Sequence, residues 1–430
     1  MTSRRVVNAA VIGSVVEFYD FTLFGLAAAL VFNEQFFPSA SPVAGTLGAF
    51  ATFAVGFFAR PVGGAVFSHF GDRVGRRQML VVTLLLMGVS TAGIGLLPTY
   101  ETAGLLAPVL LTLLRVAQGF GAGAEYAGAL VMTAEASDPR RRGLWAALPG
   151  AGVSAGILLA TLVFTGAAAL PFFETWGWRV PFLLSLAGVG VGLYFRFRVP
   201  ESEIFERERS RGLSRFPMLE VVRRQPRSLL IVFVANAPFG AMSYIIQVFV
   251  LSYVTRTLGL PATVGLLANV ACAAVAIVAG PLFGLLSDRV GRRPVFLGGA
   301  AFLAVFGFPM FWLLGTGDPV LVIVAVVLGY GGGITAMFAA QAALYTELFQ
   351  TRYRYSGIAI AREWTAALTS GPAPFVATAL VAGAGGASWP IALLITVCAV
   401  ISYVAVALAP ETRDTDLDTY AGDLATYSPS

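Results

Sequence analysis

Two acidic residues and one arginine interrupt long apolar stretches of this sequence. Glu17 and Asp20 lie three residues apart in an apolar run near the N-terminus, and Arg115 lies in another run. A charge at the middle of a bilayer costs about 2.5–3.5 kcal/mol on insertion scales, so such charges usually have a function. In a helix the two acids share one face, and two like charges this close favour protonation of one of them. The pair is therefore a candidate proton carrier.

The arginine is the natural partner of these acids. A guanidinium binds carboxylates through two parallel hydrogen bonds, so Arg115 is predicted to pair with Asp20 or Glu17 in the empty protein and with a substrate carboxylate in the loaded one. Glu125 lies ten residues further, about 15 Å along the same helix, and is predicted to relay protons or to pair with Arg60. A permanent structural ion pair is the alternative for each of these charges.

Further polar and aromatic residues in apolar runs are candidates for contact with a small substrate. Arg362 and Glu363 are neighbours that point about 100° apart on a helix, so we expect one of them to face a cavity. Helix packing is the alternative role for the neutral members of this set. The substrate-binding candidates are Arg115, Gln118, Tyr19, Asn236, Tyr244, Gln247, Tyr345, Arg362 and Trp364.

The composition places these residues in a membrane. Of 430 residues, 57% are hydrophobic and 12% are charged, whereas a soluble domain carries about 25% charged residues. A soluble fold, a disordered chain and a disulfide scaffold are thereby excluded. The two cysteines, Cys272 and Cys398, lie in apolar runs and are expected to be buried hydrophobes. With a single histidine, we expect no metal site and no other cofactor.

Twelve segments are apolar over about the 20 residues that a spanning helix needs. The fold class predicted is therefore an all-α membrane protein with twelve transmembrane helices. The segments are 6–32, 44–70, 78–98, 104–134, 144–169, 178–197, 227–252, 262–287, 295–315, 319–347, 355–381 and 387–409.

The loops between these segments differ in charge. Arginines gather at 4–5, 73–77, 140–142, 196–227, 289–293 and 352–354, all on one side of the predicted arrangement. The positive-inside rule places this side, with both termini, in the cytoplasm. The net charge of +5 is thus explained by topology. We expect a monomer in a lipid bilayer, whose partners are a small molecule and protons and not nucleic acid.

The two halves of the chain repeat each other. The stretch Gly64–Arg77 recurs as Gly280–Arg293, and both copies end in Asp-Arg-Val-Gly-Arg-Arg. Parallel repeats of six helices are typical of secondary transporters, with the substrate held between the halves. We therefore predict two pseudo-symmetric six-helix bundles, 1–197 and 227–409, joined by a cytoplasmic linker, 198–226, and followed by a cytoplasmic tail, 410–430.

The repeated loops are predicted to act as gates. An acid such as Asp72 can bind the positive N-terminus of a neighbouring helix, while the arginines pair with acids on adjacent helices. The alternative is that the arginines only anchor the topology and bind lipid. The gating candidates are Asp72, Arg73, Arg76, Arg77, Glu135, Asp288, Arg289, Arg292 and Glu347.

Several segments resemble the major facilitator superfamily, and within it the metabolite:proton symporter family of shikimate, 2-oxoglutarate, citrate and proline/betaine carriers. They include Glu17–Phe21, Ala59–Gly64, Gly71–Arg77, Arg115–Gly119 and Trp176–Phe182, although Phe18 stands where the resemblance implies a tryptophan. The resemblance implies no enzymatic activity, but proton-coupled import of a small carboxylated metabolite, shikimate-like or another organic acid, by alternating access across a bacterial inner membrane. Proton-driven efflux and proline/betaine-type osmolyte:proton symport are the alternatives.

Overall fold

A computed structural model of the protein describes residues 2–39, 41–74, 76–123, 128, 130–131, 133–134, 137, 139–198 and 217–415; for some of these, including 68–74, 76 and 77, it describes the backbone alone. The helices are α1 (Thr2–Leu30), α2 (Phe32–Gln35), α3 (Pro42–Val74), α4 (Arg76–Gly95), α5 (Tyr100–Ala103), α6 (Leu106–Ala122), α8 (Arg142–Ala168), α9 (Val180–Arg198), α11 (Pro217–Arg224), α12 (Pro226–Tyr244), α13 (Val250–Ser252), α14 (Ala262–Val290), α15 (Arg292–Gly315), α16 (Pro319–Val326), α17 (Thr335–Glu347), α18 (Thr351–Thr365), α19 (Ala373–Gly383) and α20 (Trp389–Ala407).

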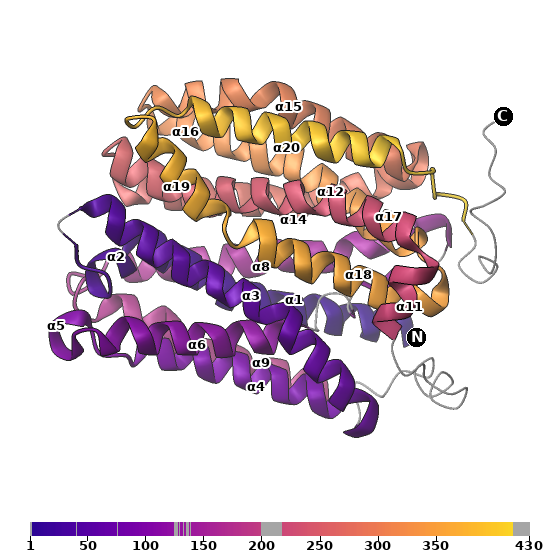
Figure 1. Ribbon diagram of the computed structural model, residues 1–430, viewed down its shortest axis with the longest axis horizontal. Helices are drawn as coiled ribbons and strands as arrows, with labels where there is room; N and C mark the ends of the chain where they lie inside the picture. Colours follow the sequence, from indigo (N-terminus) through magenta and orange to yellow (C-terminus); the bar gives the residue numbers. More distant parts are fainter. Residues whose placement is uncertain are drawn as a thin grey trace.

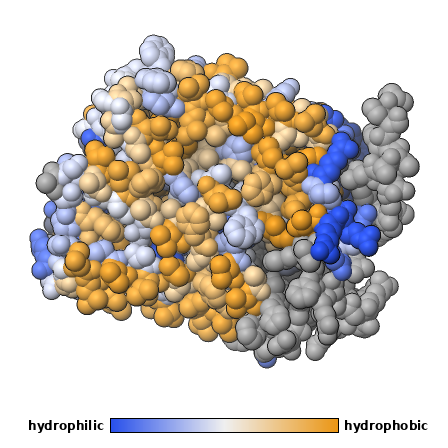
Figure 2. All heavy atoms as spheres, viewed as in Figure 1, coloured by the Kyte–Doolittle hydropathy of each residue, from blue (hydrophilic) through white to orange (hydrophobic). Residues whose placement is uncertain are grey.

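The predicted all-helical membrane fold is confirmed. Ten helical stretches in the described part of the chain are long and apolar enough to cross a membrane, and two shorter apolar helices, 81–95 and 106–122, match the third and fourth predicted segments. Apolar side chains cover the middle of the molecule, while hydrophilic ones gather at its two ends (Figure 2). Every one of the twelve predicted segments coincides with a helix or a run of helices.

The helices form two groups that lie side by side (Figure 1). We call residues up to 198 the N-terminal half and residues from 217 the C-terminal half. The halves meet where α8 packs on α14 and α17, and where α3 packs on α18 and α19. The chain begins at the end of the molecule that carries α11 and the start of α18 (Figure 1), which we call the basic end. The other end carries α2 and α5, and we call it the opposite end.

Local sequence sets where these helices start and stop. At α16, Asp318 accepts hydrogen bonds from the backbone N–H groups of Val320 and Leu321, and Pro319 occupies the first helical position, which needs no N–H. Between α14 and α15 the backbone of Gly291 has φ +106°, a conformation that favours glycine. This turn breaks one long apolar stretch into two antiparallel helices.

Three spans of the C-terminal half contain π-helical segments. They are η3 (Ile245–Phe249) and η4 (Tyr253–Thr257) after α12, η5 (Val327–Ile334) before α17, and η6 (Ala366–Ser370) after α18. A π-helical turn carries an extra residue and frequently occurs at functional sites. The segments adjoin Tyr244 and Arg362, two of the predicted substrate residues.

Helices α3 and α6 approach each other backbone to backbone. A Cβ atom at Gly119 would overlap the carbonyl oxygen of Gly56, and one at Gly63 would overlap the carbonyl oxygen of Phe120. Small residues at such positions let transmembrane helices pack closely. This contact holds α6, and with it Arg115, against α3.

We expect Gly119→Ala to lower the stability of the protein by about 1–3 kcal/mol, because the methyl group overlaps a backbone atom that no side-chain rotation can move. Gly190→Ala on α9 is the matched control, since a Cβ there meets nothing within 4 Å. The control should be neutral or stabilise the helix by a few tenths of a kcal/mol. Thermal unfolding in detergent measures both. Equal melting temperatures for the two variants would contradict the close contact.

Candidate functional site

Asp20 is a fully buried acid whose carboxylate accepts no hydrogen bond. It lies on α1 with 0% exposure, and neither side-chain oxygen has a hydrogen-bond partner among the described residues. The Thr91 hydroxyl and the Arg115 guanidinium act on it, but Thr91 donates to the carbonyl of Met87 instead (2.9 Å). A charged carboxylate is strongly disfavoured in such surroundings, so the neutral, protonated acid suits this position.

Arg115 lies beside Asp20 within a cage of aromatic rings. Its Cζ is 4.6 Å from the ring centre of Phe21, 4.2 Å from Phe24 and 5.0 Å from Phe53. The guanidinium donates to Gln118 Oε1 (2.5 Å) and to the Phe53 carbonyl (3.4 Å). Ring faces stabilise a desolvated cation, so the arginine can stay charged here without an ion pair at contact distance in the described structure.

Gln118 connects this cation to α1 and α4. Its side-chain amide donates to Thr91 Oγ1 (2.8 Å) and to the backbone carbonyl of Asp20 (3.4 Å). Arg115, Gln118 and Thr91 are therefore connected by hydrogen bonds next to Asp20. If Asp20 lost its proton, the donors of these three side chains could turn toward its charged carboxylate.

Glu17, the second acid of α1, belongs to a different cluster. Its Oε1 accepts from Nη2 of Arg60 on α3 (3.2 Å), and Arg60 also binds Glu363 on α18 (2.8 Å). All three side chains are at most 8% exposed. The sequence identified each of these charges but did not pair Arg60 with Glu363, which lies 303 positions away in the chain.

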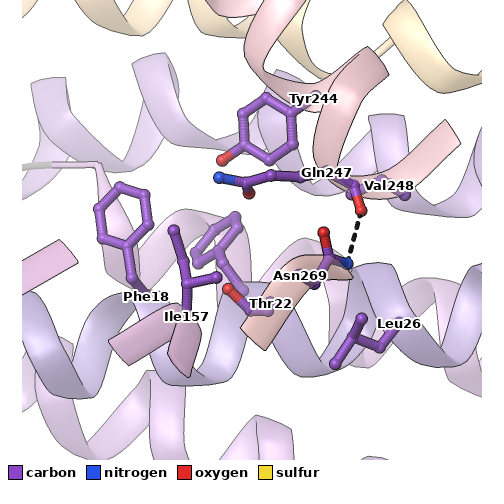
Figure 3. A pocket seen from close by; sticks show the side chains of 9 residues that line it. Phe18, Thr22, Leu26, Ile157, Tyr244, Gln247, Val248 and Asn269 are labelled. Carbon is purple, nitrogen blue, oxygen red and sulfur yellow. Dashed lines mark hydrogen bonds between the residues drawn. The ribbon is translucent and has the colours of Figure 1, made fainter. Parts of the chain in front are cut away.

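A small cavity lies between the two halves near these clusters (Figure 3). Phe18, Phe21, Thr22, Leu26 and Ile157 line it from the N-terminal half, and Tyr244, Gln247, Val248 and Asn269 from the C-terminal half. Tyr244 and Gln247 extend side by side toward Phe18 (Figure 3). The free space is about 10 Å³, about enough for one water molecule. A metabolite fits only after the halves move apart.

Three polar atoms of α17 are buried without hydrogen-bond partners in the described structure. They are both side-chain amide atoms of Gln341 and the hydroxyl of Tyr345, on side chains that are 1% and 0% exposed. Arg362 on α18 is near enough to Tyr345 and Tyr244 to act on both electrostatically. Unpaired buried polar groups are costly, and these are available to a hydroxylated ligand.

Three other sequence candidates lie apart from the cavity. The Tyr19 hydroxyl donates to the carbonyl of Pro181 inside the N-terminal half (2.9 Å). Trp364 is 51% exposed on the outer surface, because it lies about 100° around the helix from Glu363. Asn236 donates to Thr365 Oγ1 (2.5 Å) and so joins α12 to α18. We leave all three out of the site proposed below.

The basic end is closed by an ionic cluster that joins the halves. The carboxylate of Asp288 accepts from the backbone N–H groups of Gly143 (2.7 Å) and Leu144 (3.0 Å), at the start of α8. Glu347 binds Arg142 of the N-terminal half and Arg292 of the C-terminal half, both at 3.2 Å. An anion at a helix N-terminus satisfies unpaired N–H groups and the helix dipole. This is the arrangement that the repeated loop predicts.

The N-terminal copy of the repeated loop lies partly outside the residues that the structure describes. Glu125 and Glu135 are not among the described residues, and the backbone but not the side chains of Asp72, Arg73, Arg76 and Arg77 is described. Arg289, the remaining candidate, is exposed. The sequence did not single out Arg142 among the three arginines 140–142, since only the fold shows which one turns inward.

At the opposite end, one arginine that the sequence analysis did not single out joins the two halves. Arg256 donates to the carbonyls of Ala29 (3.2 Å) and Leu30 (3.1 Å) at the end of α1, and to the side chain of Asn33. Its Nη1 is 3.4 Å from Glu34 Oε1. A cation suits the C-terminal end of a helix, where the last carbonyls lack partners. In the part of the chain that the structure describes, polar contacts thus join the two halves at both ends.

Comparison with known proteins agrees with this architecture. The sequence model of the Major Facilitator Superfamily matches residues 10–370 and 232–421. The shikimate transporter of Escherichia coli (strain K12) is 34% identical over 417 residues, covering 96% of this chain and 95% of its own. An inner membrane metabolite transport protein of the same strain is 37% identical over 425 residues, covering 96% of each chain.

A solved structure shows the same fold. The proton:xylose symporter bound to 6-bromo-6-deoxy-D-glucose superposes with a TM-score of 0.75 over 96% of both chains, at 16% sequence identity. At this identity the likeness concerns the fold alone. Since the family model and two relatives above 30% identity together span nearly the whole sequence, this chain belongs to the Major Facilitator Superfamily and is a membrane transporter, not an enzyme.

Proposed function

We propose that the protein is a proton-coupled symporter that imports a small carboxylated metabolite, shikimate-like or another organic acid, by alternating access. The observation that carries the proposal is Asp20, an acid fully buried beside Arg115 whose oxygens have no hydrogen-bond partner in the described structure. A group that is stable there only with a proton, next to a retained cation, is suited to couple proton binding to the binding of an anion. The 34% identical shikimate transporter supports this substrate class.

The coupling follows from charge balance. In the occluded state Asp20 holds its proton and Arg115 is positive, so the interior accommodates one negative charge from the substrate. When the proton leaves, the carboxylate of Asp20 neutralises Arg115, the interior no longer accommodates the negative charge of the substrate, and the substrate is released. Bound substrate and bound proton therefore stabilise each other, as linkage requires.

We further propose that the basic end faces the cytoplasm of a bacterial inner membrane, with residues 1–197 and 227–409 as the two moving bundles. The arginine-rich loops support this orientation, as does the inner-membrane relative. Opening of the Asp288 and Glu347 cluster would then release substrate inward, and opening at Arg256 would admit it from outside.

The cavity lining favours a second candidate, a proline/betaine-type osmolyte:proton symporter. Phe18, Phe21 and Tyr244 line the cavity together, and aromatic faces bind quaternary ammonium groups. A zwitterionic osmolyte would place its carboxylate toward the arginines and its ammonium group among these rings.

The test is uptake of labelled shikimate, other organic acids and glycine betaine into proteoliposomes with an imposed inward proton gradient. We expect accumulation of an acid, abolished by an uncoupler and by Arg115→Ala. An acid that accumulates equally with the uncoupler present would disprove proton coupling. Movement of betaine alone would select the second candidate, and gradient-driven movement of cationic or neutral compounds instead of acids would indicate efflux.

A further inference from the structure

Arg60 is one cation shared by two acids from opposite halves of the molecule. Its Nε and Nη2 donate to the two carboxylate oxygens of Glu363, at 2.8 and 3.3 Å, and Nη2 also reaches Glu17 Oε1 at 3.2 Å. The contact with Glu363 is the two-pronged arrangement in which a guanidinium binds a free carboxylate. It joins α3 of the N-terminal half to α18 of the C-terminal half, and both side chains are nearly excluded from solvent.

This ion pair lies directly behind the wall of the cavity. The ring centre of Phe21 is 4.9 Å from Cζ of Arg60, and Phe21 also lines the cavity. Tyr244, on the facing wall of the cavity, packs on Phe57 with 5.2 Å between ring centres, and the ring centre of Phe57 is 5.9 Å from Cζ of Arg60. A small displacement of these rings would therefore connect the guanidinium with the cavity.

We propose that Arg60 binds the carboxylate of the substrate, and that Glu363 occupies this position while the transporter is empty. The inference rests on the proposed import of an organic acid and adds the residue that anchors it. Glu363 carries one negative charge, so a monocarboxylate that replaces it beside Arg60 leaves the sum of the charges around the guanidinium unchanged. A second carboxylate on the substrate would bring an uncompensated charge into the interior, which is strongly unfavourable. The preferred substrate is a monocarboxylate.

The backbone around Glu363 allows it to leave. α18 ends two residues later, at Thr365, and continues as the π-helical segment Ala366–Ser370, a type of turn that frequently occurs at functional sites. Arg362, its neighbour in the chain, acts on both Tyr244 and Tyr345 and supplies a cation near the displaced carboxylate. Substrate binding thus breaks the ion pair between Arg60 and Glu363, and the contact between the two halves depends on whether substrate is bound.

The test removes the Glu363 carboxylate from Arg60 by substitution and supplies a small free carboxylate in the buffer. Purified full-length Glu363→Ala is expected to melt about 2–4 °C higher in 100 mM sodium acetate than in 100 mM sodium chloride, because acetate binds the exposed guanidinium and stabilises the folded state. Wild type should show no such difference and Glu363→Gln a smaller one than Glu363→Ala, since an amide of the same size still fills the space but binds the guanidinium more weakly than a carboxylate does. If Glu363→Ala does not fold, Glu363→Ser leaves nearly the same space.

Two further variants decide what the acetate binds. Adding Arg60→Gln to Glu363→Ala should remove the acetate effect, whereas adding Trp364→Ala, an exposed neighbour, should not. An absent effect in Glu363→Ala, an equal effect in Glu363→Gln, or an effect that survives the loss of Arg60 would each overturn the proposal. This assay needs no knowledge of the physiological substrate, so its outcome is independent of the uptake experiment above.

Transport provides the second measurement. With shikimate as the probe, Glu363→Gln is expected to lower the half-saturation concentration about tenfold by removing the internal competitor, and Arg60→Gln to raise it at least about tenfold. If wild type moves no shikimate while acetate still binds at Arg60, the choice of substrate fails and the carboxylate site stands. Unchanged half-saturation in both variants would overturn the proposal.

Discussion

Asp20→Asn is expected to lower net proton-driven uptake by about 100-fold while leaving exchange of internal for external substrate intact. Asparagine reproduces the shape and the neutrality of protonated aspartate at a position that is 0% exposed. The variant can therefore bind substrate and pass through the occluded state in both directions. It cannot lose a proton, so the coupling factor, typically 5–150-fold for linked ligands, disappears.

The measurement compares two fluxes of labelled substrate in the same proteoliposomes, one driven by an imposed proton gradient and the other by internal unlabelled substrate. Glu101→Gln is the matched control, an identical change of acid to amide at an exposed residue of α5, and should alter neither flux. Retained gradient-driven uptake in Asp20→Asn would show that another acid carries the coupled proton. Loss of both fluxes would make Asp20 a structural residue.

Glu347→Gln should open the basic end of the transporter. Glu347 is 1% exposed and binds Arg142, Arg292 and Thr412, so an amide there leaves two buried guanidinium groups without their shared anion. Removing one partner from a buried ionic cluster costs about 3–5 kcal/mol. In a transporter that cost falls on the closed conformation, since water solvates both arginines once the halves separate. A shift of this size changes the ratio of closed to open molecules by about 100-fold or more.

Spin labels at Arg141 and Arg289, exposed residues of the two halves at this end, report the opening by pulsed EPR. We expect a single short distance in the otherwise unchanged protein and a longer, broader distribution with Glu347→Gln. Thr412→Val is a milder comparison, because it removes one hydrogen bond to Glu347 (2.6 Å) but keeps both ion pairs. Identical distributions in all three proteins would show that the cluster does not hold the halves together.

The fold could be predicted almost fully from the sequence, because membrane spans are set by local composition. Each of the twelve predicted apolar runs contains helix in the part of the chain that the structure describes, and ten of these helical stretches are long and apolar enough to cross a membrane, since a backbone in lipid must satisfy its hydrogen bonds within a helix. The π-helical segments were not predicted. An apolar run that contains a π-turn has the same composition as one that lacks it, so η3 to η6 left no signal in the sequence.

The site could be predicted as a set of charges but not as pairs. Asp20, Glu17, Arg60 and Arg115 were each recognisable as charges in apolar runs, yet their partners depend on packing between distant helices. Glu363 forms an ion pair with Arg60 because α18 packs against α3. A search for acids at the same depth in the other bundle would have found it. Asp288 could be predicted better, since the repeated loop places an acid beside a helix start.

At both ends of the molecule, a charged side chain of the C-terminal half binds main-chain atoms of the N-terminal half. Asp288 accepts from the N–H groups of Gly143 and Leu144, and Arg256 donates to the carbonyls of Ala29 and Leu30. Main-chain atoms are the same in every residue type, apart from the missing N–H of proline. These hydrogen bonds therefore do not depend on the side chains at Leu144, Ala29 and Leu30, whereas Gly143 must stay a glycine, because a Cβ there would lie 2.6 Å from the carbonyl oxygen of Gly284. Related carriers that diverge in their N-terminal bundles could keep the same two seals, and hybrids that combine halves from different relatives should still close.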